Sequence, residues 1–315
     1  MRLTLASWLL FACGQGAPGA DVTGPYFEHA MFFNRDVKAS PVAPDSAQMI
    51  AALRAAGGWG NEDHFRVDKS FAVLRADGSP AREFTPSASF VSPDCDLAPV
   101  PVPAAGNLEG ETGYACTQHG DCHLIVIDDD AGKLYEMWHA NITSTSFEGG
   151  CLAVWDTQRA YDDTLRGDQC TSADAAGLPI APMLLDVDEV IGGSIDHALR
   201  FVLPNDRIRQ GFVRPATHGA FSAGDPGAPF YGLHLRLRSD FPVETLTSTG
   251  AQVVARTLQR YGMYLADGGD DTLTAIASPR WDGLLGTQDL YPLKVEDFEV
   301  IDHGPMFPLT NSCRR

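Results

Sequence analysis

Three histidines carry the side chains best suited to proton transfer in this sequence. His123, His197 and His218 lie at or near the ends of segments that we expect to be strands. Because histidine exchanges protons near neutral pH, a cluster of the three would form an acid–base site or a three-nitrogen metal site. Each one taken singly also fits a histidine whose ring is satisfied by packing against a sheet. The sequence leaves both interpretations open.

Asp174 is the carboxylate with the most unusual surroundings, because it lies in a run of small residues at positions 172–177. Small neighbours would let the backbone approach closely and present the carboxylate at the floor of a cleft, or they would allow a tight turn. Asp196 and His197 would point to opposite faces of one strand and so do not predict an acid–base pair. A carboxylate pair for sugar hydrolysis would have to join separate segments, such as Asp174 with Asp196 or Asp156.

Other polar and aromatic side chains are candidates for binding a substrate or an ion. The arginines that we expect to bind an anionic group are Arg200, Arg214 and Arg236. Trp155 is expected to stack on a sugar ring, although most aromatic side chains are expected in the core. The acidic runs 128–130 and 267–271 offer oxygen ligands for calcium, but neither has EF-hand spacing, and solvated turns are the favoured interpretation. The sequence predicts no other cofactor.

Composition and missing motifs exclude several classes of function. The chain has 41 acidic and 23 basic residues, which give it a net charge of -18. A field of this sign repels nucleic acid and anionic lipid headgroups. The sequence contains no Gly-X-Ser-X-Gly, Walker or His-Glu-X-X-His motif, which disfavours α/β hydrolases, phosphate-loop enzymes and zincin proteases.

The first residues have the pattern of a secretion signal. The apolar run 3–12 is too short to cross a bilayer, which needs about 20 residues, but it suits a signal peptide. The segment that ends at Cys13 resembles a bacterial lipobox, in which the cysteine is lipidated and provides the only contact with a membrane. Phe11 is bulky for that pattern, so plain cleavage after about Ala20 remains an alternative.

The cysteines support export independently. Without Cys13 an even set remains, namely Cys95, Cys116, Cys122, Cys151, Cys170 and Cys313. A zinc site would need paired short spacings that the sequence lacks, so disulfides are expected. The locally plausible pairs are Cys116 with Cys122 and Cys151 with Cys170, although sequence alone does not fix the connectivity.

Hydrophobic patterning predicts many short strands and few helices. Strands are expected at 71–74, 84–91, 123–128, 133–139, 152–155, 197–203, 211–214, 233–238, 273–277 and 298–301. Helices are expected from Asp45 to Gly57 and from Ser248 or Thr249 to Gly262. We therefore expect a mainly β, sandwich or jelly-roll-like single domain at 24–315, which follows a signal peptide at 1–12 and a flexible tether at 13–23.

Several longer motifs resemble a widespread family of secreted bacterial proteins. The motifs are Thr171-Ser-Ala-Asp-Ala-Ala-Gly-Leu-Pro179, Ile195-Asp-His-Ala-Leu-Arg-Phe201 and Arg260-Tyr-Gly-Met263 with Leu265-Ala-Asp267. The resemblance covers nearly all of the mature chain and implies that it folds as one unit. It implies no particular activity.

The sequence thus supports two hypotheses. The first is a secreted or surface-anchored carbohydrate-active enzyme, a glycoside hydrolase or polysaccharide lyase, with Asp174, His123, His197 and His218 as acid–base groups. The second is a non-catalytic module of the bacterial cell envelope that binds a glycan or a protein, in which the same polar groups satisfy one another. Secreted β folds host both roles, so the fold does not decide between them.

Overall fold

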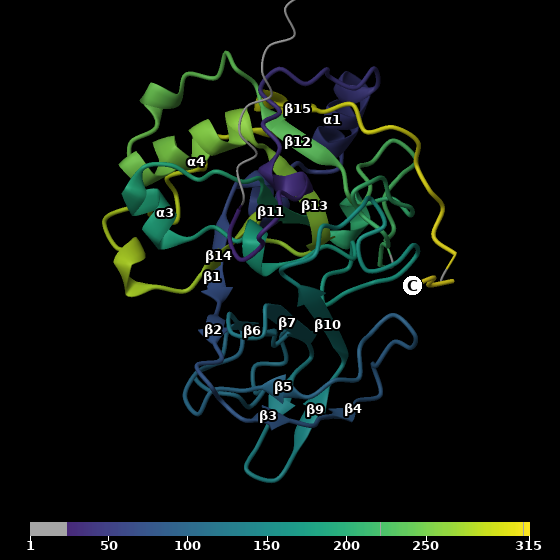
Figure 1. The fold of residues 1–315 in the computed structure, drawn as a ribbon. Coiled ribbons are helices and arrows are strands. Elements are labelled where there is room, and N and C mark those ends of the chain that lie inside the picture. Colours follow the sequence, from purple (N-terminus) through teal and green to yellow (C-terminus); the bar gives the residue numbers. More distant parts are fainter. Residues whose placement is uncertain (1–23, 221, 311) are drawn as a thin grey trace, which may run out of the picture.

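The chain folds into two lobes that lie one above the other (Figure 1). The computed structural model describes residues 24–220, 222–310 and 312–315. Residues 73–156 form the smaller lobe, while residues 24–71 and most of the chain from 157 onward form the larger lobe. The expected mainly β architecture with few helices is confirmed. The predicted signal peptide and tether, with Cys13, lie outside the described residues.

The larger lobe is built on a mixed six-stranded sheet. Its strands in spatial order are β1 (Val67–Phe71), β14 (Leu273–Ile276), β11 (Leu199–Leu203), β13 (Met263–Gly268), β12 (His234–Leu237) and β15 (Phe298–Val300). β1 is parallel to β14 and β11 is parallel to β13, whereas the other neighbours are antiparallel.

Helices cover this sheet. They are α1 (Ser46–Ala55), α2 (Gly60–Asp63), α3 (Val187–Gly192) and α4 (Thr249–Arg260), with 3-10 turns η1 (Phe32–Asn34), η2 (Ala181–Met183), η3 (Asn205–Arg207), η4 (Val243–Thr245), η5 (Pro279–Trp281) and η6 (Val295–Asp297). α4 packs against β12 and α3, and α1 packs against β15. The Ser248 side chain caps α4 by accepting a hydrogen bond from the Ala251 backbone, as the sequence predicts. α1 also forms as predicted, but Asp45 makes no side-chain cap.

The smaller lobe contains one larger sheet and two short ones. The larger sheet has the order β10 (Cys151–Asp156), β7 (Lys133–Trp138), β6 (Leu124–Asp128) and β2 (Val73–Arg75). The short sheets pair β3 (Ala81–Arg82) with β5 (Val100–Pro101), and β4 (Thr85–Pro86) with β9 (Phe147–Gly149) and β8 (Asn141–Ile142).

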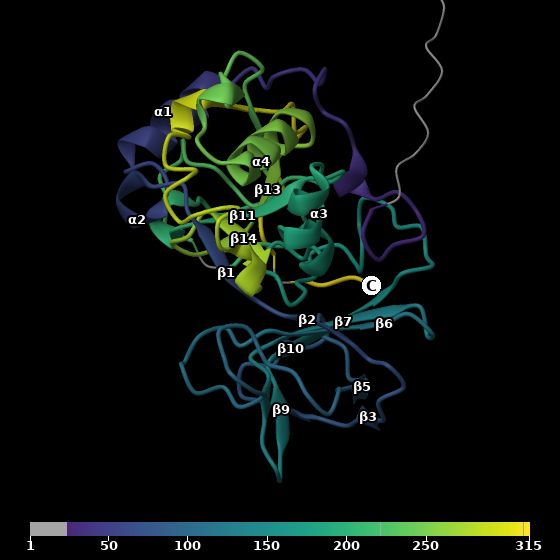
Figure 2. The same ribbon diagram turned by 90° about the vertical axis from the view of Figure 1, so that its left-hand side faces the viewer.

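The four-stranded sheet lies between two hydrophobic cores, which explains the continuous apolar run of β6. Alternate side chains of a strand point to opposite faces. Ile125 and Ile127 therefore pack into the core of the larger lobe, while Leu124 and Val126 pack into the core of the smaller lobe. This strand is therefore buried on both faces. Only Ala72 separates β1 from β2, so a nearly continuous strand joins the two lobes (Figures 1 and 2).

The six described cysteines form three disulfides, Cys95–Cys151, Cys116–Cys122 and Cys170–Cys313. The predicted pair Cys116–Cys122 is confirmed, and the predicted pair Cys151–Cys170 is wrong. Cys151 begins β10, which lies beside the loop of Cys95, because Asp96 donates its backbone N–H to the Leu152 carbonyl. Three disulfides fit a protein that folds in an oxidising, extracellular environment.

Two other expected strands differ from the structure. The segment 84–91 keeps only the two-residue strand β4, and 211–214 forms only isolated bridges at Phe212. β12 alternates apolar and polar residues, but His234 and Arg236 are buried as well. Both buried side chains have polar partners: His234 bonds the Tyr261 carbonyl, and Arg236 pairs with Glu299.

Candidate functional site

A cleft opens where the two lobes meet, with a volume of about 390 Å³. It is lined by Asn61, Arg66, Asp68, Phe71, Glu109, Asp121, His123, Arg200, Val202, Gly268, Gly269, Asp270, Asp271 and Thr274. We call it the lobe cleft. Clefts between structural units that gather a few polar groups are common ligand sites. Of the residues that the sequence singles out for catalysis or binding, His123 and Arg200 lie in this cleft, together with residues 268–271 of the second acidic run.

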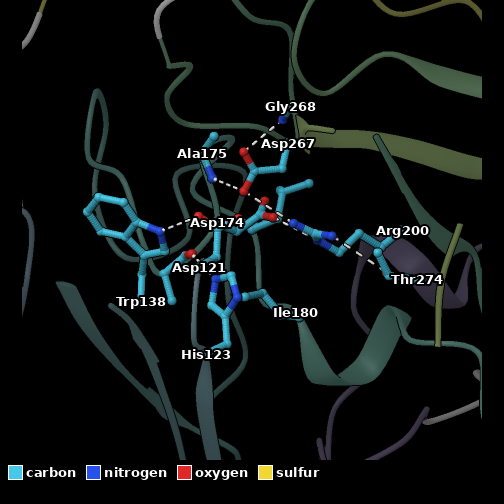
Figure 3. A network of polar contacts seen from close by, with 12 residues as sticks. Asp121, His123, Trp138, Asp174, Ala175, Ile180, Arg200, Asp267, Gly268 and Thr274 are labelled. Carbon is cyan, nitrogen blue, oxygen red and sulfur yellow. Dashed lines mark hydrogen bonds and ion pairs between the residues drawn. The ribbon is translucent and has the colours of Figure 1, made fainter. Parts of the chain in front are cut away.

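Arg200, from β11, forms the floor of the lobe cleft. Its guanidinium is almost completely buried, and Nε donates to Asp174 Oδ1 at 2.8 Å, while Nη2 donates to Asp267 Oδ2 at 3.2 Å (Figure 3). Thr274 Oγ1 lies 3.5 Å from Nη1, and the guanidinium lies over the ring of Phe71. Three of its five N–H donors are therefore bonded within the protein, which fixes the arginine in place.

Asp174 lies behind Arg200 and does not line the cleft. Its side chain is fully buried, and Oδ2 has no hydrogen-bond partner among the described residues. Burial raises the pKa of Asp174 to about 8; Arg200 opposes this shift and Asp267 adds to it. Ser172 Oγ accepts from the Asp174 backbone N–H, so the small-residue run forms a tight turn that aims the carboxylate at Arg200. Asp174 therefore supports the floor of the cleft rather than facing a substrate.

Asp267 completes the network under the cleft, and the sequence points to it only as an oxygen ligand for calcium. It lies near the end of β13, accepts from the backbone N–H groups of Gly268 and Ala175 and bonds Arg200 (Figure 3). Burial raises the pKa of Asp267, and Arg200 opposes this shift. Since Asp174 and Asp267 share one guanidinium, one cation stabilises a fully buried carboxyl group and a partly buried one.

His123, from the start of the β6 segment, holds the two lobes together at the cleft. Nδ1 lies 2.6 Å from Glu109 Oε2, and Nε2 lies 3.0 Å from the Ala173 carbonyl oxygen. Burial opposes the charged ring, but the charge of Glu109 and its hydrogen bond raise the pKa of His123 to about 9. Both ring nitrogens therefore donate, and the imidazolium has no free nitrogen to act as a base.

Two carboxyl groups of the cleft, Asp68 and Glu109, have pKa values displaced in opposite directions. Burial raises the pKa of Asp68, whereas the hydrogen bond from Ser70 opposes it and the charge of Glu109 adds to it. Burial also works against the charge of Glu109, but His123 lowers its pKa below the ordinary value. A backbone hydrogen bond of 3.1 Å from the Gly110 N–H to the Ser70 carbonyl holds the loop of Glu109 beside β1.

The rim of the cleft carries further carboxylates. Asp121 is exposed and accepts from Trp138 Nε1 at 2.9 Å (Figure 3). Asp271 pairs with Arg66 at 3.3 Å, and Asp270 lies beside it. A Cβ atom on Gly60 would lie 1.9 Å from the Asp270 carbonyl, so only glycine allows α2 to approach this loop so closely.

The other predicted histidines lie outside the lobe cleft. His197 lines a separate cavity with Tyr26 and Glu189, where Nε2 lies 3.1 Å from Glu189 Oε2 and Nδ1 lies 2.9 Å from the Ala198 carbonyl. His218 bonds the Ala175 carbonyl at 3.0 Å, and burial lowers its pKa. Among the described residues the three histidines therefore do not line one pocket, because His123 lines the lobe cleft, His197 lines the separate cavity and His218 lines neither.

The remaining predicted binding residues hold structure together. Arg214 pairs with Asp168, and Arg236 binds Glu299 and two backbone carbonyls. Trp155 is fully buried, and its indole donates to Glu136 Oε2 at 2.9 Å. None of the three lines the lobe cleft in the part of the chain that the structure describes.

Metal-ligand geometry is restricted to one group among the described residues, Glu111 with Cys116 and Cys122. The two cysteines form a disulfide, so neither sulfur offers a thiolate to a metal. In the run 128–130, Asp128 accepts from the Ala131 backbone and Asp129 pairs with Arg75, as in a solvated turn.

Comparison with known proteins gives no guide to the site, since no family model, no curated protein and no solved structure matches this chain. Within its described part, none of the helices combines the length and the apolar character needed to cross a bilayer.

Proposed function

We propose that this protein is an extracellular glycoside hydrolase that acts in the lobe cleft, with Asp68 as the general acid and Glu109 as the ionised carboxylate. The observation that carries the proposal is the opposite displacement of two neighbouring pKa values in one cleft. Glycosidic hydrolysis requires one carboxyl group that keeps its proton and one that has lost it. Burial supports the first state at Asp68, and His123 supports the second at Glu109.

Hydrolysis by this pair requires two proton transfers, one from Asp68 and one to Glu109. Asp68 gives its proton to the glycosidic oxygen while the bond from that oxygen to the anomeric carbon breaks. Glu109 takes a proton from a water molecule, whose oxygen forms the new bond to the anomeric carbon. Return of that proton to Asp68 restores the enzyme, and one water molecule is consumed for each bond cleaved.

His123 acts as a positioning residue in this proposal. Its ring holds Glu109 Oε2 and keeps the carboxylate ionised, while its other nitrogen anchors it to the opposite lobe. Arg200, Asp174 and Asp267 form the rigid floor below. The assignment therefore moves the acid–base roles from Asp174 and the histidines to carboxylates that line the cleft.

The charge of the cleft favours hydrolysis over the lyase reaction. Of the described residues that line it, five are carboxylic acids and three are basic, namely Arg66, His123 and Arg200. Each of the three already has a carboxylate partner. A lyase must neutralise the carboxylate of a uronic acid before it removes the neighbouring proton, and this cleft repels such a group. We therefore infer an uncharged or amino-bearing extracellular glycan as the substrate.

We also propose that the protein acts outside the cytosol. Three disulfides support folding outside the reducing cytosol. Together with the signal-like start of the sequence and the resemblance to secreted bacterial proteins, they support a role in the cell envelope, either lipid-anchored through Cys13 or released.

A glycan-binding or protein-binding module is the alternative. One observation favours this alternative. The charged side chains of Arg200 and His123 at the floor of the cleft form their hydrogen bonds with other groups of the protein. In that case the cleft would bind a sugar chain through its rim carboxylates without cleaving it.

A screen of the purified protein on a panel of extracellular polysaccharides tests the proposal, with release of reducing ends as the measurement. Asp68→Asn and Glu109→Gln should each lower turnover by a factor of about 100 or more. Glu244→Gln, which neutralises an exposed carboxylate at η4, is the matched control and should leave turnover unchanged. Binding without release of reducing ends would support the module, and full turnover in both cleft variants would rule out the assigned pair.

A further inference from the structure

We propose that this protein has a second site, an oxyanion-binding pocket beside its C-terminal segment, which takes a phosphate, sulfate or carboxylate group. The pocket lies on the smaller lobe's four-stranded sheet, where the C-terminal end of the chain runs beside β7 and β10 (Figure 2). Its volume is about 370 Å³, and none of its lining residues belongs to the lobe cleft. The inference therefore does not depend on the function proposed for the cleft.

The pocket concentrates positive charge in a strongly acidic chain. Its basic lining residues are Lys133, Arg159, Arg166, Arg314 and Arg315. The carboxylates that line it are Asp96 and Asp156. The pocket thus has an excess of three positive charges, and an excess of two remains if a terminal carboxylate follows Arg315. In a chain whose net charge is -18, this excess is a local reversal of sign.

One carboxylate serves two of these arginines. Asp96 Oδ2 lies 2.6 Å from Arg166 Nη2, and Asp96 Oδ1 lies 2.5 Å from Arg315 Nη1. Lys133 has a partner of its own in Asp156, at 2.7 Å. Burial lowers the pKa of Arg166, Asp96 opposes this shift, and the nearby charge of Arg315 lowers it further. A second anion would relieve this repulsion between arginines.

Two arginines of the pocket form no ion pair among the described residues, although the charge of Arg159 helps to lower the pKa values of Asp156 and Asp162. Arg159 is exposed and lies over the ring of Tyr161, and Arg314 is exposed at the mouth of the pocket. A guanidinium presents parallel N–H donors that match the spacing of two oxygens of a phosphate, sulfate or carboxylate group. These two side chains are therefore the donors available to an incoming oxyanion.

Covalent links hold the pocket in shape. Asp96 follows Cys95, which is bonded to Cys151 on β10, and Arg314 follows Cys313, which is bonded to Cys170. A pair of backbone hydrogen bonds between Asp168 and Arg314 fixes the terminal segment further. A rigid site loses little conformational freedom when it binds a small anion.

Isothermal titration of the purified full chain tests the inference, with sodium phosphate, sodium sulfate, a galacturonic acid trimer and a neutral galactose trimer as probes. We expect one equivalent of an anionic probe to bind, with weaker affinity as sodium chloride is added. The double variant Arg159→Gln and Arg314→Gln should weaken this binding at least about tenfold, because each lost charged hydrogen bond contributes about that factor. The double variant Arg54→Gln and Arg256→Gln removes two exposed arginines elsewhere and is the matched control.

The relative affinities of the four probes distinguish the possible ligands. Tighter binding of the uronate trimer than of sulfate and phosphate identifies a glycan as the source of the anion, and the opposite order identifies a free inorganic ion. Absence of binding at one equivalent, equal affinity in the pocket variant, or equal affinity for the neutral trimer would overturn the inference. Circular dichroism of the variants verifies that the fold is intact.

Discussion

The Nδ1 atom of His123 and the Oε2 atom of Glu109 lie 2.6 Å apart at the junction of the two lobes. The ring is almost completely buried and its second nitrogen bonds the carbonyl of Ala173 on the opposite lobe. The pair therefore has two consequences: it keeps Glu109 ionised in a partly dry cleft, and it ties the smaller lobe to the larger one. Each consequence can be measured separately.

The first consequence concerns the pH dependence of hydrolysis. Glu109 must be ionised to act, so the rate rises with pH through its pKa, which His123 holds low. Arg200 also lowers this pKa and Asp121 raises it, so His123→Gln removes the largest of the favourable charges. We expect the acidic limb of the kcat/KM profile to move to higher pH by about 1 to 2 units. An unchanged limb would show that His123 has no such role. His29→Gln, which changes an exposed histidine, should leave the profile unmoved.

The second consequence concerns stability. The pKa of His123 is raised to about 9 in the folded protein from 6.5, so its contribution is fully present below pH 6.5 and is lost as pH rises through about 9. The pKa of Glu109 is lowered, so its contribution is present above about 4.5 and is lost as pH falls. Urea unfolding should therefore show a gap between the protein and His123→Gln that shrinks by about 3 kcal/mol from pH 6.5 to 9.5. A gap independent of pH would mean that the pair is not charged.

The effect of Asp174 on the free energy of unfolding should depend on pH, because Asp174 carries a proton in the folded protein that it loses in the unfolded chain. The folded protein raises its pKa to about 8, so the native state holds a proton that the unfolded chain releases. Its contribution to stability therefore falls as pH rises from about 4 to 8. Asp174→Asn, which cannot ionise, should flatten this slope. Asp174→Ala should lower the free energy of unfolding by about 1 to 3 kcal/mol, because it leaves the buried Nε–H of Arg200 without its hydrogen-bond partner. A steeper slope in the Asn variant would contradict the protonated state.

The N-terminus of the mature protein distinguishes lipidation at Cys13 from plain cleavage. If Cys13 is lipidated, mass spectrometry of the protein from a bacterial envelope fraction should show a first residue at position 13 that carries acyl chains. Cleavage by the ordinary signal peptidase would instead give an unmodified N-terminus near residue 21 and a soluble product. A full-length N-terminus at Met1 would exclude both forms of the secretion hypothesis.

The sequence predicts elements better than it predicts the site. The strands β6 and β7 and the helix α4 can be predicted from local patterns, because hydrophobic periodicity and helix capping act over short stretches of sequence. The even number of cysteines is found by counting. His123 and Arg200 can be found because they are ionisable residues within segments that the sequence predicts to be strands. Glu109 cannot, since it lies in a long loop rich in proline and glycine, and only the closure of one lobe on the other brings it beside Asp68. The same reason explains why the three histidines separate: their sequence positions carry no information on which carbonyl each ring meets.

The disulfides should differ in their effect on stability because they close loops of different length. Cys116 and Cys122 are 6 residues apart, whereas Cys170 and Cys313 are 143 apart. The loss of chain entropy in the unfolded state grows with the logarithm of loop length, so the short link contributes about 2 kcal/mol and the long one about 5 kcal/mol in this model. Two double variants, each with both cysteines of one disulfide replaced by serine, should reproduce this order in urea unfolding.

The Cys170→Ser and Cys313→Ser pair should also weaken anion binding beside Arg314, while the Cys116→Ser and Cys122→Ser pair should not. If both serine pairs destabilise the protein equally, enthalpic contacts around the sulfurs outweigh the chain entropy.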